Sequence, residues 1–175
     1  MGRVAVRQVV AAYLENLNLL HVGTVFPARP LIVTEEDYDL TMAGFITTSS
    51  NGSSAVLVVN IPDSKRTVEA LTGRAGLEDK DIHSVVLELF LANTAGDAMG
   101  AQADHDAIVD AINAGVRGDP TLGAPSVVFS AGEFDAGIQV TQREPFTTLD
   151  GTTIVMPALI EFDVWEWIEG TPGSA

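Results

Sequence analysis

The last long apolar segment of the chain alternates between two kinds of side chain over residues 152–169. The apolar set is Ala158, Ile160, Phe162 and Val164, and the intervening set is Leu159, Glu161, Asp163, Trp165 and Trp167. Because strand side chains point alternately to opposite faces, this pattern predicts one long strand with a core face. Its second face, with acids and large aromatics, is suited to another protein surface or to a charged cavity.

Two segments have the spacing of amphipathic helices. In residues 3–17, apolar side chains recur every three or four positions, which predicts a helix with one buried face. A second helix is predicted to begin after Thr94, as its cap, and to stop near Gly118, before a proline. Its predicted inward stripe is Ala98, Ala101, His105, Ile108, Ile112 and Val116.

Shorter β-rich segments fill much of the remaining sequence. Residues 43–48 and 54–60 flank Asn51-Gly52, a dipeptide that favours a hairpin turn. Residues 82–92 are apolar on both faces apart from Ser84 and Glu88, as in a central strand. Further strands are predicted at 126–130 and 137–141, and Asp150-Gly151 marks a turn into the last strand.

This order of elements predicts an α+β fold. Strands come in runs with helices between them, which favours a mostly antiparallel mixed sheet flanked by two main helices. The chain has 175 residues, of which 46% are hydrophobic and 19% charged, as expected of one folded domain. We expect a single domain over residues 1–170 and a flexible tail over 171–175, because the chain ends in small and polar residues, GTPGSA over 170–175.

Charge and special residues exclude several classes of protein. The formal net charge is −15, so sequence-specific DNA binding is not expected. The chain has no cysteine, which excludes disulfides and zinc–thiolate sites. The first residues mix Arg3, Arg7 and Glu15 among apolar ones, unlike a signal peptide. No apolar run approaches the about 18 residues of a membrane helix, so no membrane span is expected.

The sequence offers few candidates for metal binding. Asp104, His105 and Asp106 are adjacent, and adjacent helix positions point about 100° apart, so they cannot converge on one ion. Asp106 and Asp110 have the i, i+4 spacing of a helical metal-ligand pair, but two acids on a solvated helix face need no metal ion to account for them. His105 lies on the apolar stripe and is expected in the core. We therefore predict no metal ligands.

Catalytic chemistry is also not predicted. Glu161 and Asp163 would form a same-face carboxylate pair, but any strand with this alternation produces such a pair. His21 and His83 have no partner visible in sequence, and none of the common nucleotide-binding, hydrolase or metalloprotease motifs occurs. The prediction is a protein that is not an enzyme, with no catalytic residues and no cofactor.

Two groups of residues are candidates for protein contacts. Lys65, Arg66 and Arg74 form the only basic cluster of the sequence and are a possible docking patch for an acidic neighbour. The alternative is a set of solvated loop charges. Trp165 and Trp167 share a strand face and could anchor an interface. Their alternative role is packing beneath the first helix of the same subunit.

Several segments together resemble the tail terminator proteins of long-tailed, siphovirus-type actinobacterial phages. They are the opening amphipathic helix, VGTVFPARPLIV (22–33), a strand ending VVNIP, VVLELFLAN, QADHDAIVDAI (102–112) and the closing DGTTIVMPALIEFDVWEWIEG. The resemblance spans nearly the whole chain, and the order of the segments carries it. It implies a noncatalytic structural subunit of a homohexameric ring in the neck of the virion, assembled in the cytoplasm of the bacterial host.

The resemblance also implies partners and a channel. The ring would sit on the head-proximal end of the tail tube, end the polymerisation of the tube protein, and contact the head–tail stopper protein. Genomic DNA would pass through without specific binding, because an acidic lining repels phosphate. We expect the acids that face this channel to be Glu161 and Asp163, or those of the 35–39 loop, such as Glu35, Glu36 and Asp37.

Three alternatives remain open from the sequence. The chain could be another neck component, either a head–tail stopper or a tail-completion protein, since these are also small and noncatalytic. It could be a small acidic enzyme, which would require a deep pocket with converging titratable groups. It could also be a monomeric binding module that uses the tryptophan face.

Overall fold

The computed structural model describes residues 2–28, 52–70, 77–132, 137–147 and 151–167, with the side chains of 66–70, 77–80, 129 and 167 left out. Within this part the chain forms a single α+β domain, as the sequence predicted. The helices are α1 (Arg3–Asn16) and α2 (Ala98–Gly118). The strands are β1 (Val22–Phe26), β2 (Ser53–Ala70), β3 (Leu77–Asn93), β4 (Val128–Ala131), β5 (Gln139–Gln142), β6 (Phe146–Thr147) and β7 (Ile154–Trp167).

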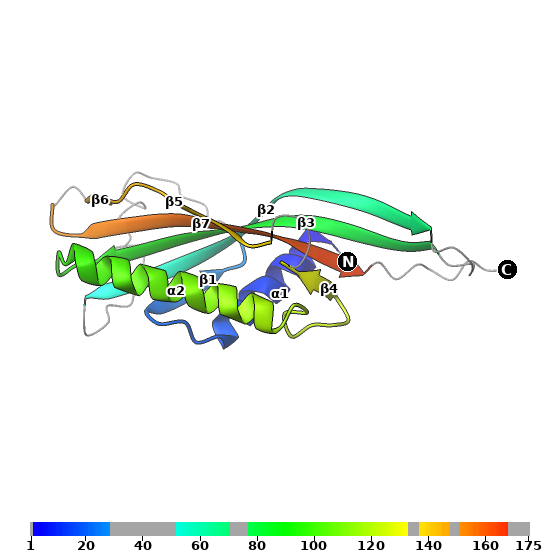
Figure 1. Cartoon of the computed structure of the whole chain (residues 1–175), viewed down its shortest axis with the longest axis horizontal. Helices are drawn as coiled ribbons and strands as arrows, with labels where there is room; N and C mark the ends of the chain where they lie inside the picture. Colours follow the sequence, from blue (N-terminus) through cyan, green and yellow to red (C-terminus); the bar gives the residue numbers. More distant parts are fainter. Residues whose placement is uncertain (1, 29–51, 71–76, 133–136, 148–150, 168–175) are drawn as a thin grey trace.

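The described strands join in one mixed sheet with the order β1-β2-β3-β7-β4, and β5 and β6 also pair with β7 (Figure 1). Of the strand pairs in the described part of the chain, only β1–β2 is parallel, and the rest are antiparallel. β3 lies between β2 and β7 along almost its whole length, which confirms the central strand predicted from its two apolar faces. The mostly antiparallel sheet is also confirmed.

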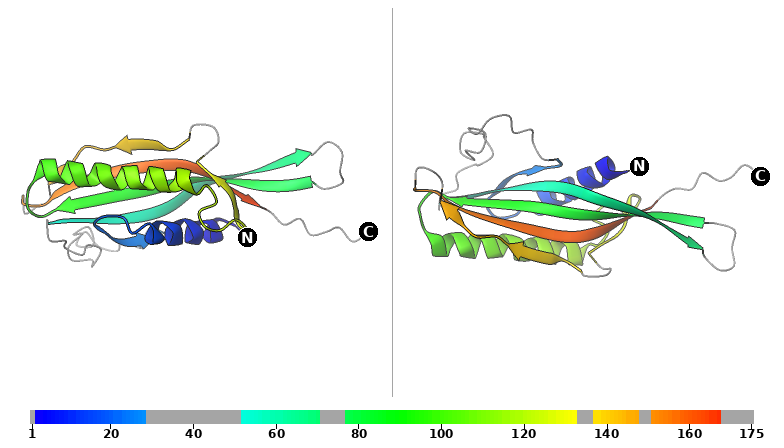
Figure 2. Two further views of the ribbon diagram at one scale, coloured as in Figure 1. Left: turned by 60° about the horizontal axis from the view of Figure 1, so that its bottom comes forward. Right: turned by 90° about the horizontal axis from the view of Figure 1, so that it is seen from above.

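Both helices lie on the same face of the sheet (Figure 2). α1 packs on β1 and β2, and α2 packs on β3 and β7. The helices also meet each other, because the Tyr13 hydroxyl donates a hydrogen bond of 2.6 Å to the carbonyl oxygen of Gly115. Gly115 leaves room for Leu17, whose Cδ1 atom would lie 2.7 Å from any added Cβ. The result is a two-layer domain.

The core lies between the helices and the sheet. In β7, Ala158, Ile160, Phe162 and Val164 are between 0 and 4% exposed, so the predicted core face is confirmed. α1 contributes its predicted face through Val6, Val10 and Leu14. From α2 the predicted stripe is buried from Ala101 onward. These side chains form one continuous apolar cluster with those of β2 and β3.

The start of α2 differs from the prediction. The helix begins at Ala98 and its cap is Asp97, whose Oδ1 accepts a 3.0 Å hydrogen bond from the Gly100 amide. Thr94 instead donates its hydroxyl hydrogen to the Gly52 carbonyl at 3.3 Å, so it stabilises the end of β3. Ala98 is exposed and does not belong to the buried stripe. Both residues can cap a helix, and the tertiary contact of Thr94 decides between them.

β2 and β3 are much longer than predicted and pair with each other from Ser53↔Asn93 to Ala70↔Leu77. The sequence interpretation ended the first of them at Asn60, because a proline and several charges follow. Pro62 lies in a register shift between Asn60 and Asp63, beyond the part of β2 that pairs with β1. A strand tolerates proline at a bulge or an unpaired edge. The predicted strand at 43–48 lies outside the described residues.

The ends of β2 and β3 form an extension that we call the hairpin arm, residues 67–70 and 77–80. β7 stops pairing at Lys80↔Trp167, so the outermost pairs of the arm have no third strand among the described residues. Figure 1 shows the arm projecting past both helices. A two-stranded ribbon is only marginally stable alone in water, which makes the arm a natural element for contacts with another chain.

Candidate functional site

The side of β2, β3 and β7 opposite the helices is the first candidate surface, and we call it the open face. Neither helix covers it, as the view from above in Figure 2 shows. Residues opposite one another in antiparallel strands share a face, so the strand register identifies its members. By this register the members of the open face are Val56, Val58, Asn60, Asp63, Lys65, Ile82, Ser84, Val86, Glu88, Phe90, Pro157, Leu159, Glu161, Asp163 and Trp165.

Acidic side chains gather in the middle of the open face. Asp163 lies opposite Ser84, whose hydroxyl donates to Asp163 Oδ1 at 3.0 Å, and Asp63 lies on the other side of Ser84. Glu161 belongs to the next row and is exposed. Glu88 accepts a 2.5 Å hydrogen bond from the Asn60 side chain. Glu161 and Asp163, the two channel candidates that lie within the described residues, therefore belong to a larger acidic group.

A mixed basic and aromatic row lies beside the acids, toward the hairpin arm. Lys65, Ile82 and Trp165 are directly opposite one another on β2, β3 and β7. Lys65 is exposed and Trp165 is half-buried. This register places Trp165 on the face away from α1, so its predicted alternative role beneath the first helix is wrong. The face thus brings together Lys65, Trp165, Glu161 and Asp163, which the sequence interpretation had assigned to three separate groups.

The other predicted site residues are not placed by the structure. Glu35, Glu36, Asp37 and Arg74 lie outside the described residues. Arg66 and Trp167 are described only by their backbone, in β2 opposite Asp81 and in β7 opposite Lys80. Their predicted roles stay predictions.

An apolar edge is the second candidate surface. β5 and β6 pair only with β7 among the described strands, and every described residue of β5 is exposed. Val140 in β5 is 41% exposed and Phe146 in β6 is 51% exposed. A strand edge with exposed apolar side chains is a ready template for pairing with another chain. The sequence prediction placed a strand here but did not identify it as an interface.

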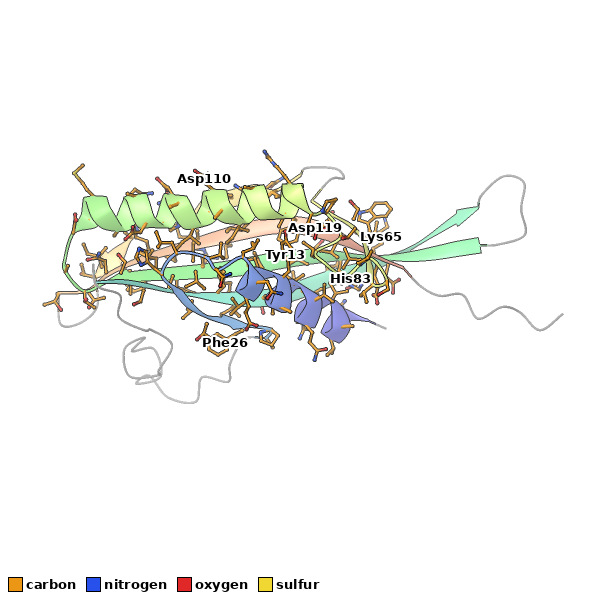
Figure 3. All side chains as sticks on the ribbon, turned by 90° about the horizontal axis from the view of Figure 1, so that it is seen from below. Tyr13, Phe26, Lys65, His83, Asp110 and Asp119 are labelled. Atoms are coloured by element: carbon orange, nitrogen blue, oxygen red, sulfur yellow. The ribbon has the colours of Figure 1, made fainter. Side chains whose placement is uncertain are left out.

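A buried polar cluster on the helix-facing side is a feature that the sequence interpretation missed. Its centre is His83, which is 1% exposed, and Glu166, which is 2% exposed. His83 Nε2 lies 2.8 Å from Glu166 Oε2, and His83 Nδ1 lies 2.7 Å from the hydroxyl of Ser64. Arg3, at the start of α1, donates from Nε to the same hydroxyl at 2.8 Å. Figure 3 shows His83 near the base of the hairpin arm.

Asp81 completes this cluster. It lies opposite Glu166 in the β3–β7 register, and one ligand atom from each of Asp81, His83 and Glu166 lies within 4.8 Å of the others. Glu166 Oε1 is buried and has no hydrogen-bond partner among the described residues. The strand alternation contained a signal for this position, because Glu166 follows Val164 by two residues and therefore continues the core-facing series of β7.

The row Ser64–His83–Glu166 contains the three residue types of a serine hydrolase triad. A hydrolase also requires a substrate-accessible serine beside donors directed at an oxyanion. Here the histidine and the glutamate are almost completely buried, and the serine hydroxyl is held by Arg3. The row by itself therefore does not define an active site.

The other histidines take part in separate contacts. His21 Nε2 lies 3.4 Å from Asp104 Oδ1, which joins the start of β1 to α2. His105 is buried in the α2 stripe, as predicted, with Nδ1 3.4 Å from Asp106 Oδ1. Asp106 also accepts a 2.7 Å hydrogen bond from Gln102. Asp104, His105 and Asp106 thus do not converge on one point.

Two titratable groups near the end of α2 have shifted pKa values. Asp119 accepts hydrogen bonds from the Thr121 hydroxyl, the Gly123 amide and the Thr121 amide, at 2.7, 2.9 and 3.1 Å. These bonds, the hydroxyl first, hold the pKa of Asp119 below its ordinary value. The pKa of Tyr13 is raised by burial and, second, by the charge of Asp119. Both effects belong to the helix-facing layer and not to the open face.

Comparison with known proteins finds no family model that matches the chain and no matching curated protein. Among the described residues, no helix combines the length and the apolar character needed to span a bilayer.

Proposed function

We propose that this chain is a noncatalytic structural subunit of a phage tail terminator, a ring at the head-proximal end of the tail tube. The observation that carries the proposal is the open face, where half-buried apolar residues such as Leu159 and Trp165 lie beside four carboxylates and Lys65. A face of mixed apolar and charged character is typical of a surface that meets other proteins. The sequence resemblance to tail terminators specifies the kind of assembly.

The two-layer architecture supports contacts between copies of the chain. A closed ring requires heterologous contacts, in which two different patches of one subunit meet. The apolar edge of β5 and β6 is one suitable patch, with Val140 and Phe146 exposed. The hairpin arm and the neighbouring row of Lys65 and Trp165 form another, on the opposite side of β7. Pairing of these two patches between neighbours would close the ring.

The acidic group supports the proposed passage of DNA. Asp63, Glu88, Glu161 and Asp163 lie on one face of a chain whose formal net charge is −15. A channel lined by such carboxylates would repel phosphates and would release few counterions, so DNA could slide without being held. We propose that Glu161 and Asp163 face the channel of the ring. The partners in this proposal are the tail tube protein on one side and the head–tail stopper protein on the other.

The experiment is co-assembly of the purified chain with polymerising tail tube protein, followed by negative-stain electron microscopy. A terminator shortens the tubes at substoichiometric amounts and adds a ring at one end. If the chain were instead a head–tail stopper or a tail-completion protein, its addition to the tube protein alone would leave the tube length unchanged. Unchanged tube lengths with bare ends would contradict the proposal.

A charge-reversed variant tests the proposed contact patch in the same assay. Lys65→Glu combined with Arg66→Glu places two acids at the base of the hairpin arm, so we expect fewer rings and longer tubes. The control is Arg117→Glu, which reverses an exposed charge at the end of α2, on the helix side of the domain. Equal activity of the two variants would show that the arm does not take part in ring contacts.

A further inference from the structure

We propose that Asp81, His83 and Glu166 form a binding site for a divalent transition-metal ion such as Zn²⁺, at the base of the hairpin arm. Neither the proposed function nor any sequence motif assigns a ligand to these residues. The site joins β3 to β7 and lies on the helix-facing side of the sheet, opposite the acidic group of the open face.

The geometry supplies three ligand atoms that already lie close together. His83 Nε2 and Glu166 Oε2 are 2.8 Å apart, and an oxygen of Asp81 lies within 4.8 Å of both. Ligands bound to tetrahedral zinc at about 2.1 Å are about 3.4 Å apart. Small side-chain movements, which widen the His83–Glu166 separation and bring the Asp81 oxygen closer, would therefore bring all three atoms into coordination.

Burial gives a second and independent indication of a ligand. Glu166 is 2% exposed, and its Oε1 atom has no hydrogen-bond partner among the described residues. Desolvating a carboxylate oxygen without a partner costs free energy. Asp81 lies opposite Glu166 in the β3–β7 register and so brings a second carboxylate to the same point. A cation bound beside Glu166 would offset the cost of its buried oxygen.

The surroundings of His83 match those of a metal ligand. A metal-bound histidine usually donates its other ring N–H to an oxygen, which orients the ring. His83 Nδ1 lies 2.7 Å from the Ser64 hydroxyl oxygen, which can accept two hydrogen bonds and already accepts one from Arg3 Nε. Metal binding at Nε2 would then place the proton on Nδ1, where Ser64 accepts it.

The donor set selects the class of ion. One imidazole and two carboxylates suit Zn²⁺ and other first-row transition ions better than Mg²⁺ or Ca²⁺, which prefer oxygen ligands alone. Asp81 is only half-buried, so an ion and a water ligand can reach the site from its side. The bound ion would fix the end of β7 to β3 where the hairpin arm begins.

The test is calorimetric titration of the chelator-treated full chain with ZnCl₂. We expect one Zn²⁺ per chain, and we expect Glu166→Gln to weaken binding at least tenfold. The matched control is Asp104→Asn, which removes the carboxylate beside His21 and should leave binding unchanged. Absence of Zn²⁺ binding to the unmodified chain would overturn the proposal.

A second measurement does not depend on a variant that folds. The chain has three histidines, so long-range ¹H–¹⁵N correlation spectra can follow each imidazole during the Zn²⁺ titration. We expect a large shift of His83 Nε2 and a protonated Nδ1, with His21 and His105 unchanged. Zn²⁺-dependent shifts at His21 or His105 in place of His83 would overturn the assignment of the site. This outcome is independent of whether the chain forms rings.

Discussion

Asp119 shows how a single side chain can organise the end of a helix. It is the C-cap residue of α2, and its carboxylate accepts three hydrogen bonds from Thr121 and Gly123 in the following turn. The turn then leads into β4, which pairs with β7. The side chain thus connects the local hydrogen bonding of one turn to the position of a strand.

Replacing Asp119 by Asn is expected to destabilise the domain by about 1–2 kcal/mol at pH 7, because charged hydrogen bonds are lost or weakened. Because folding lowers the pKa of Asp119, its contribution is present above the ordinary value of 3.8 and is lost as the pH falls through the folded value. Urea denaturation of the unmodified chain and of Asp119→Asn should therefore show a smaller difference in the free energy of unfolding at pH 3 than at pH 7.

Asp110→Asn is the control for this prediction, because Asp110 is exposed on the outer side of α2 (Figure 3). It should change the free energy of unfolding by less than about 0.5 kcal/mol at both pH values. A difference between Asp119→Asn and the unmodified chain that grows on acidification would contradict the role of the carboxylate.

Residue faces were the most predictable part of the sequence. Period-two alternation predicted the buried and open sides of β7 correctly, and the helical spacing predicted His105 in the core. The polar cluster was missed because its members come from three strands and α1. His83 and Glu166 are 83 positions apart, and no local spacing reports such a contact. Extending the alternation by one step, from Val164 to Glu166, was the only available signal.

At the scale of elements, long strands proved harder to predict than helices. The predicted first helix at 3–17 agrees with α1 to within one residue at its end, because its periodicity is uninterrupted. The extension of β2 was not predicted because Pro62 and the charges after it resemble a loop. Pairing with β3 over the full length overrides that local signal. The hairpin arm is therefore a tertiary feature.

The contact between α1 and α2 gives a prediction at the element scale. Tyr13→Phe removes the hydrogen bond to the Gly115 carbonyl and should destabilise the domain by about 1 kcal/mol at neutral pH. Because folding raises the pKa of Tyr13, its contribution is complete below the ordinary value of 10.0 and is lost as the pH rises through the folded value. Chemical denaturation between pH 7 and 11 should compare the free energy of unfolding of the unmodified chain with that of Tyr13→Phe. The difference between the two should narrow only at the alkaline end of this range.

Absorbance at 295 nm provides an independent check on Tyr13. The chain has two tyrosines, so an alkaline titration of the folded chain should show a late phase, and Tyr13→Phe should remove it. Persistence of the late phase in the variant would show that it belongs to the other tyrosine.

At the scale of the whole molecule, the layers are asymmetric. The helices and the apolar core fill one side of the sheet, while the other side mixes acids, Lys65 and Trp165 with apolar residues such as Val86 and Leu159. The fold class and the two main helices could be predicted because they depend on local periodicity. The sequence could not predict that the acids and the contact residues would share one face. That arrangement depends on the register among β2, β3 and β7. That register sets the surface from which we infer assembly.

Cryo-electron microscopy of tail tube ends bound to this chain tests the central claim most directly. We expect a closed six-fold ring on one end of the tube, with Glu161 and Asp163 facing the channel and the hairpin arm contacting a neighbouring copy. Tube ends without added density, or single copies bound with the open face toward solvent outside the tube, would contradict the account.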